Sequence, residues 1–238
     1  MPETKRFGDL LPDWRPPVGA PYRHARGQYA GIEPLDATRH ASELFRANSV
    51  DDSIWDYLPY GPFHSAATYH KWVTSVTVGA SDPLFYAIRE SGTGRAAGVA
   101  SFLRITPTMG SIEVGHINLS PALQGTRAAT EAMYLMMRQV FGAGFRRYEW
   151  KCDALNLPSR RAAQRLGFSF EGVFRQAAVY KGRNRDTAWF AITDKEWPAL
   201  QSAFQAWLAP SNFDATGQQL ERLSDLTCLV RVADDPEV

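Results

Sequence analysis

The chain has little of several features that mark special classes of protein. Only two of its 238 residues are cysteines, Cys152 and Cys228, which is too few for a disulfide framework and predicts a reducing compartment. The 26 basic and 25 acidic residues leave a net charge of +1, so no strong field favours nucleic acid or a membrane surface. No uncharged apolar run approaches the roughly 18 residues of a membrane span, and the first residues lack the apolar core of a signal peptide. We therefore expect a cytoplasmic protein without a membrane or nucleic-acid partner.

Enough apolar sequence is present to build a core. Hydrophobic residues make up 45% of the chain, which is typical of a globular protein that needs no disulfide staples. Five of the 15 prolines fall within the first 27 residues. Because proline has a fixed φ and no amide donor, we predict that residues 1–27 form an extended, Pro-rich arm. Residues 28–196 then form the main domain, and residues 197–238 form a C-terminal helical extension packed on it.

Strand and helix patterns follow one another along this domain. Strands are predicted at 28–33, 84–89, 97–105, 111–119, 148–152, 168–180 and 184–192. Helices are predicted at 36–48, 65–76, 126–141, 158–166 and 194–208. Two βα units among hairpins indicate a mixed sheet rather than a doubly wound parallel one. We therefore expect one α/β (α+β) domain, with a mixed, mostly antiparallel sheet of about seven strands flanked by helices.

The segment SPALQGTRAATEA, between the strand at 111–119 and the next helix, is suited to bind an anion. The start of a helix presents unpaired amides, and the macrodipole adds about half a positive charge there, which fits a pyrophosphate. Three small residues, Gly125, Ala128 and Ala129, would let a ligand approach the backbone. Arg127 could add a charge-assisted hydrogen bond. The alternative is a plain loop before a helix that begins with small residues.

Two sequence blocks carry a resemblance to a known family. The blocks IEVGHINLSPALQGTRAATEA and NLPSRRAAQRLGF, separated by one helix and one strand, resemble the GNAT superfamily of N-acetyltransferases. They are most similar to its ribosomal-protein N-acetyltransferase (RimJ/RimL-like) branch. Gln124 and Ala129 match the family pattern Gln/Arg-x-x-Gly-x-Gly/Ala, whereas Arg127 stands where the middle glycine is expected.

The resemblance implies acetyl-CoA as co-substrate, an amine as acceptor and no metal. An acetyl group would move to a primary amine of a small molecule or a protein N-terminus, by direct attack in a ternary complex. An alternative is a non-catalytic CoA-binding sensor or interaction module, because Arg127 replaces a glycine and Ala163 replaces the tyrosine that often protonates the thiolate. The sequence leaves a homodimer open.

The resemblance also implies a set of cofactor-binding residues. These are Asn118, Leu119, Gln124, Gly125, Thr126, Arg127, Ala128, Ala129, Asn156 and Ser159. The strand at 111–119 should splay from the strand at 148–152 and expose its backbone to the pantetheine arm. Asn156 and Ser159 could equally cap the second helix. The basic residues Arg160, Arg161 and Arg165 could contact the 3′-phosphate of CoA or form a solvated face.

Three residues are candidates for catalysis. Glu113 lies where many similar enzymes carry their base, so it is the leading proton acceptor, with a solvated strand carboxylate as the alternative. His116 is the second choice, because its ordinary pKa suits proton transfer. Strand alternation puts His116 on the opposite face from Glu113 unless a bulge intervenes. By resemblance, Ser159 would place its hydroxyl near the sulfur.

The acceptor wall is predicted in the aromatic loop DDSIWDYLPYGPF. Its candidate substrate-binding residues are Trp55, Tyr57, Tyr60 and Phe63. Asp51, Asp52 and Asp56 would attract a cationic amine. The alternative is that the aromatic side chains belong to the core or to a dimer contact, which applies to Trp55 and Phe63 in particular.

Overall fold

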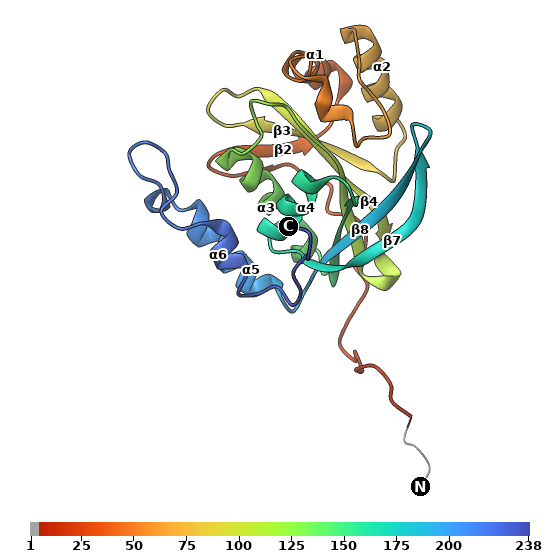
Figure 1. Ribbon diagram of the computed structural model, residues 1–238, viewed down its shortest axis with the longest axis vertical. Helices are drawn as coiled ribbons and strands as arrows, with labels where there is room; N and C mark the ends of the chain where they lie inside the picture. Colours follow the sequence, from red (N-terminus) through yellow and green to blue (C-terminus); the bar gives the residue numbers. More distant parts are fainter. Residues whose placement is uncertain (1–4) are drawn as a thin grey trace.

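Residues 5–238 are described by a computed structural model, in which eight strands form one sheet (Figure 1). The strands are β1 (Ala25–Arg26), β2 (Ala30–Pro34), β3 (Leu84–Glu90), β4 (Ala96–Thr106), β5 (Ser111–Leu119), β6 (Arg147–Asp153), β7 (Ser169–Tyr180) and β8 (Arg183–Thr193). Their order is β1-β2-β3-β4-β5-β6-β8-β7, and β5 with β6 is the parallel pair among antiparallel ones. The predicted mixed, mostly antiparallel sheet is confirmed, and the added strand β1 lies inside the segment predicted as arm.

Helices cover both faces of the sheet. They are α1 (Ala37–Asn48), α2 (Ala66–Thr77), α3 (Arg127–Gly142), α4 (Leu157–Arg165), α5 (Trp197–Leu208) and α6 (Leu223–Thr227). Side chains alternate along β3, so Phe85 and Ala87 belong to the core cluster under α1 and α2. Tyr86 and Ile88 belong to the cluster around α3 on the other face. The first four helices begin at side-chain caps from Asp36, Ser65, Thr126 and Asn156, residue types that favour this position.

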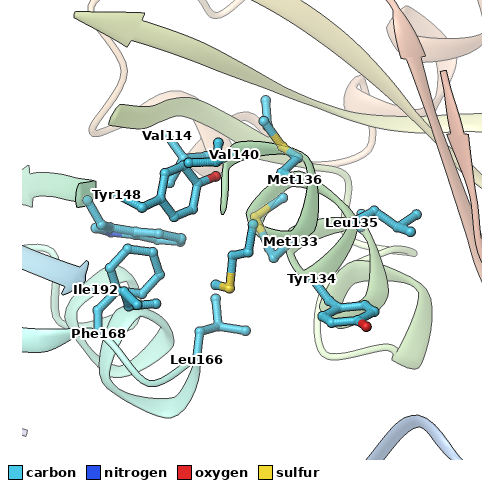
Figure 2. Packing of buried hydrophobic residues seen from close by; sticks show 14 of the residues in the cluster. Val114, Met133, Tyr134, Leu135, Met136, Val140, Tyr148, Leu166, Phe168 and Ile192 are labelled. Atoms are coloured by element: carbon cyan, nitrogen blue, oxygen red, sulfur yellow. The ribbon is translucent and has the colours of Figure 1, made fainter. Parts of the chain in front are cut away.

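Helix α3 lies at the centre of the larger core. Figure 2 shows Met133 between this helix and a group of side chains that includes Tyr148 and Phe168, whereas Tyr134 lies on another side of the helix. Tyr134 stacks on Phe204 of α5 at 5.4 Å between ring centroids. Fully burying a large apolar side chain contributes about 1.5–3 kcal/mol, so the C-terminal helices are an integral part of this core.

Two buried carboxylates join distant parts of the chain to the helices. Glu131 of α3 accepts hydrogen bonds from the amides of Gln28, Tyr29 and Ala30 at 2.6–2.9 Å, which holds the start of β2 against α3. Asp235 receives Nε of Arg160 at 2.6 Å and Nη2 at 2.5 Å, which holds the C-terminal tail against α4. The basic face predicted for α4 is thus partly buried, and Arg160 is committed to this ion pair.

The N-terminal arm extends away from the domain in Figure 1 and then joins it. Arg146 lies over the ring of Trp14 at 5.7 Å from the centroid. The hydroxyl of Tyr22 donates to the carbonyl of Phe85 at 2.5 Å, and its ring contacts Tyr86 edge to face. These aromatic residues therefore attach the arm to the sheet. Within residues 5–238, no helix is both long and apolar enough to cross a membrane.

Candidate active site

The sheet opens between β5 and β6. These strands pair only from Ser111 with Arg147 to Val114 with Trp150. Beyond that point β5 stays with β4, while β6 continues along β8 to Asp153. The backbone of residues 115–119 therefore has no strand partner on the β6 side, which confirms the predicted splay. A pocket of about 1050 Å³ lies at this opening.

A β-bulge in β5 brings the two candidate bases into the same pocket. Gly115 pairs with Ser101 and Asn118 with Val99, so β5 places two residues opposite a single residue of β4. His116 occupies the bulge with φ of 50°, in the left-handed region. Glu113 and His116 both line the pocket, which strict alternation would not allow.

His116 lies in an aromatic and cationic environment. Its Nδ1 is 3.2 Å from the hydroxyl of Tyr60, and the two rings stack with centroids 5.6 Å apart. Burial, followed by the charges of Arg104 and Arg185, lowers the pKa of His116 to about 4. Burial also raises the pKa of Tyr60 far above its usual value. Near neutral pH the imidazole is therefore uncharged, with Nδ1 engaged by a phenol and Nε2 left for a ligand.

Glu113 is neither solvated nor free. Its carboxylate oxygens receive Nη1 of Arg104 at 2.8 and 2.7 Å, and Nζ of Lys151 lies 2.9 Å from Oε2. Lys151 also lies 2.7 Å from Glu149 and 3.7 Å from the centroid of the Trp189 ring. Accepting a proton at Glu113 would disrupt these pairs. Both carboxylate oxygens of Glu113 are therefore in contact with cationic side chains.

Part of the predicted anion-binding loop is bonded internally. In the segment 124–129, the amides of Gln124 and Thr126 donate to loop carbonyls, and that of Ala129 donates to Oγ1 of Thr126 at 3.1 Å. The remaining three amides, those of Gly125, Arg127 and Ala128, make no hydrogen bond within residues 5–238. Three donors thus remain at the start of α3, where the macrodipole favours an anion.

Two predicted cofactor residues also serve the packing of the loop. The side chain of Gln124 donates to the carbonyl of Leu119 at 3.0 Å. The guanidinium of Arg127 lies over the rings of Tyr29, at 4.8 Å, and Phe213, at 4.3 Å. Arg127 therefore joins the turn before β2 to the C-terminal extension through cation–π contacts, which accounts for an arginine where a glycine was expected.

Helix α4 supplies a polar wall of the pocket. Asn156 caps the helix by accepting the amide of Ser159 at 3.1 Å, as the capping alternative predicted. The Ser159 hydroxyl accepts Nε1 of Trp150 at 3.0 Å, which leaves its own hydrogen free to donate. Burial raises the pKa of Cys152, beside Ser159, to about 11, so this thiol is not an activated nucleophile.

Asn118 has an unsatisfied side chain at the pocket wall. It is 1% exposed, and neither its Oδ1 nor its Nδ2 has a hydrogen-bond partner in the part of the chain described. Buried amides normally find partners. This side chain is therefore available to a bound molecule, in line with the cofactor role predicted for it.

Most aromatic side chains of the loop at 51–63 pack against the core rather than line the pocket. Trp55 is 2% exposed and contacts the ring of Phe63 at 5.2 Å between centroids, and neither residue lines the pocket. Tyr60 contacts His116 but is not a lining residue either. Tyr57 does line the pocket and donates to the carbonyl of Leu155 at 3.2 Å. Trp55, Tyr60 and Phe63 instead pack in or against the hydrophobic core, which was the alternative given for the aromatic loop.

Strands β7 and β8 form a further wall of the pocket, of which the sequence indicated only the polar residues around Arg185 as a possible substrate contact. Arg185, Thr187 and Trp189 all line the pocket from alternate positions of β8, and Phe174 of β7 stacks on Trp189 at 4.3 Å. Period-two spacing places the three β8 residues on one face, which was the available signal. No sequence pattern predicts that Lys151 and Arg104 lie beside Glu113, because only the register of the strands brings the three residues together.

The chain is similar to known acetyltransferases. Residues 31–169 match the family model described as acetyltransferase (GNAT) domain. A GCN5-related N-acetyltransferase from Brucella melitensis is 45% identical, with 92% of this chain and 100% of that chain covered and a TM-score of 0.89. A protein from Chromobacterium violaceum, named a probable acetyltransferase of the GNAT family, is 43% identical over 84% of this chain and 100% of its own, with a TM-score of 0.76.

A more distant structure shares the fold. The microcin C7 self-immunity acetyltransferase MccE, solved with acetyl-CoA and AMP, is 20% identical over 70% of this chain and 93% of its own, with a TM-score of 0.63. A search of curated proteins finds no match.

Proposed function

Because the chain belongs to the GNAT family of N-acetyltransferases, we propose that it moves an acetyl group from acetyl-CoA to a primary amine by direct attack in a ternary complex. The acceptor is an amine of a small molecule or a protein N-terminus. The observation that carries the proposal is the opening between β5 and β6, where unpaired backbone, the start of α3 and an uncharged histidine meet at one pocket.

The residues around the opening fit acetyl-CoA. The free amides of Gly125, Arg127 and Ala128 would hold the diphosphate, and the unpaired backbone of residues 115–119 would hold the pantetheine amides. The unsatisfied side chain of Asn118 supplies one more donor and acceptor. When bound, the cofactor supplies an activated acyl group as a thioester.

Two side chains would handle the proton and the leaving group. In the tautomer whose Nδ1–H donates to the Tyr60 oxygen, Nε2 of His116 accepts the proton that the amine loses as the N–C bond forms. The Ser159 hydroxyl donates a hydrogen bond toward the sulfur as the C–S bond breaks, because Trp150 occupies only its acceptor side. Glu113 keeps its negative charge and holds Arg104 and Lys151 in place. This assignment puts His116 before Glu113 as proton acceptor.

The test is release of the CoA thiol with a panel of polyamines, amino sugars and peptide α-amines. We expect His116→Ala to lower kcat by about 10²–10⁴-fold, the usual contribution of a general base. His70→Ala, an exposed histidine on α2, is the matched control and should leave kcat unchanged. Tight binding of acetyl-CoA without release of the CoA thiol in the presence of any amine would favour the alternative of a non-catalytic CoA-binding sensor. A large loss in Glu113→Gln with little loss in His116→Ala would return the role to Glu113.

We place the chain in the RimJ/RimL-like branch on its second sequence block, in which Asn156 and Ser159 begin α4 and Leu166, Gly167 and Phe168 follow it. Faster acetylation of peptide α-amines than of polyamines in the same panel would support that placement, and the reverse order would contradict it. The cytoplasmic location and a homodimer stay predictions, and sedimentation of the purified protein would test the dimer.

A further inference from the structure

Arg185 is a partly buried charged side chain of the pocket without a counter-ion, and its guanidinium lies over the Tyr180 ring at 5.8 Å from the centroid. Arg185 lines the pocket from β8, and its guanidinium makes no ion pair or hydrogen bond with any residue in 5–238. Its Nε is buried without an acceptor, and so is Nε1 of Trp189, four residues along the same face of the strand. Leaving a buried donor unpaired costs about 1–3 kcal/mol, so two such donors at one wall require an explanation.

The acidic residues of the pocket are already engaged elsewhere or lie at its rim. Glu113 is shared by Arg104 and Lys151. Asp153 accepts the Tyr180 hydroxyl at 2.8 Å and the amide of Leu155 at 2.9 Å. Asp51 and Asp56 line the pocket from the loop around the 3-10 helix at Asp52–Trp55, where Asp51 caps that helix. No carboxylate of the described chain pairs with Arg185.

The chemistry of a guanidinium indicates what would complete this wall. Its planar set of N–H donors matches the oxygens of a carboxylate or a phosphate, and such bonds are stronger than neutral ones. Trp189 supplies a donor and no acceptor, so it fits the same oxygens. Arg185 is also close enough to His116 for its charge to act on the imidazole. An anion at Arg185 would therefore lie near the proposed proton acceptor.

We propose that the acceptor is an amine that also carries an anionic group, a carboxylate or a phosphate, which Arg185 binds while the amine faces His116. The inference rests on the proposed function and names the substrate class for it. Asp51 and Asp56, which also line the pocket, would attract the protonated amine before it binds.

The experiment compares amines with and without the anion. One pair is an L-amino acid and its amide, and the other is glucosamine 6-phosphate and glucosamine, so that the two arms separate carboxylate from phosphate. We expect kcat/KM to favour the anionic member of at least one pair by about 10–100-fold, the range of a charge-assisted hydrogen bond. Arg185→Ala should collapse that ratio, mainly through KM, and Arg185→Lys should restore part of it.

Arg183→Ala is the matched control, because Arg183 lies two residues away on the same strand, is exposed and does not line the pocket. It should leave the ratio unchanged, and thermal melting checks that every variant folds. Equal kcat/KM within both pairs, or a preference that survives Arg185→Ala, overturns the proposal while acetyl transfer stands.

A second measurement covers the case in which no amine is acetylated and the proposed function fails. Calorimetric titration of the CoA-loaded protein with glucosamine 6-phosphate and with the amino acid measures binding without turnover. Binding that Arg185→Ala abolishes supports the anion site by itself, and the absence of binding by both compounds overturns it.

Discussion

Two arginines, Arg160 of α4 and Arg185 of β8, have very different surroundings. Arg160 of α4 is 5% exposed, and its donors meet Asp235 and the carbonyl of Ala154. Arg185 of β8 makes no ion pair or hydrogen bond in the described chain and only lies over the Tyr180 ring, although its Nε is also shielded from solvent. A charge that the chain satisfies itself serves stability, because the pair forms on folding. A charged side chain that has no counter-ion beside a pocket is suited to bind a ligand, because only a bound ligand can supply the counter-ion.

The largest effect is expected from removing the partner of Arg160. Asp235→Ala leaves a guanidinium buried without a counter-ion, and breaking a buried pair in this way costs about 3–5 kcal/mol. Chemical denaturation measures the change in the free energy of unfolding. Asp234→Ala is the control, because its carboxylate is 67% exposed and pairs with Arg231, so the loss should stay within about 1 kcal/mol. If both variants lost the same free energy of unfolding, the buried Arg160–Asp235 pair would contribute no more to stability than the exposed Arg231–Asp234 pair.

A medium effect on the pH dependence of stability is expected from His116. Its imidazole lies among Tyr60, Arg104 and Arg185, and Glu113 lines the same pocket. Its pKa falls from 6.5 in the unfolded chain to about 4 in the folded one, mainly through burial. The unfolded chain therefore binds the proton more readily, and stability falls as the pH drops from about 6.5 to about 4. The loss amounts to at most about 3 kcal/mol relative to His116→Phe.

The same titration sharpens the comparison between the arginines. Removing the positive charge with Arg185→Gln should raise the pKa of His116, so less stability is lost over that pH range. Arg183→Gln, which is exposed and outside the pocket, should not change it. Unfolding measured at several pH values decides between these outcomes. A pKa that does not move in Arg185→Gln would place the guanidinium too far from the imidazole for the proposed site.

The smallest effect is expected at the cysteines. Cys228 is exposed, whereas burial raises the pKa of Cys152 to about 11. A thiol reagent at pH 8 should therefore modify Cys228 first and reach Cys152 only after unfolding, as mass spectrometry of the labelled chain would show. Cys152→Ala should still release thiol from acetyl-CoA in the presence of an amine. Loss of all turnover would instead indicate a covalent intermediate on Cys152.

Much of the architecture could be predicted because local signals agreed with it. The caps at Thr126 and Asn156 mark where two helices begin, and both are observed. Trp14 and Tyr22 are aromatic residues within the predicted Pro-rich arm, and both contact the domain. The boundary at residue 27 was less accurate, since β1 at Ala25–Arg26 already belongs to the sheet.

The details of the site could not be predicted in the same way. Periodicity puts Glu113 and His116 on opposite faces, and the bulge that reverses this has no signature in the residues themselves. The aromatic loop could face either a ligand or the core, and burial of Trp55 decided for the core.

The order of strands and helices, the phosphate-loop candidate and the helix caps were determined by the sequence alone, because each depends on residues within a few positions of one another. The contacts Lys151–Glu113 and Arg160–Asp235, and the unpaired state of Arg185, were decided only by the tertiary structure. They depend on strand register and on how the tail packs, and these join residues that are tens of positions apart. The charge of a side chain is a property of the residue, but whether that side chain has a counter-ion depends on the whole fold.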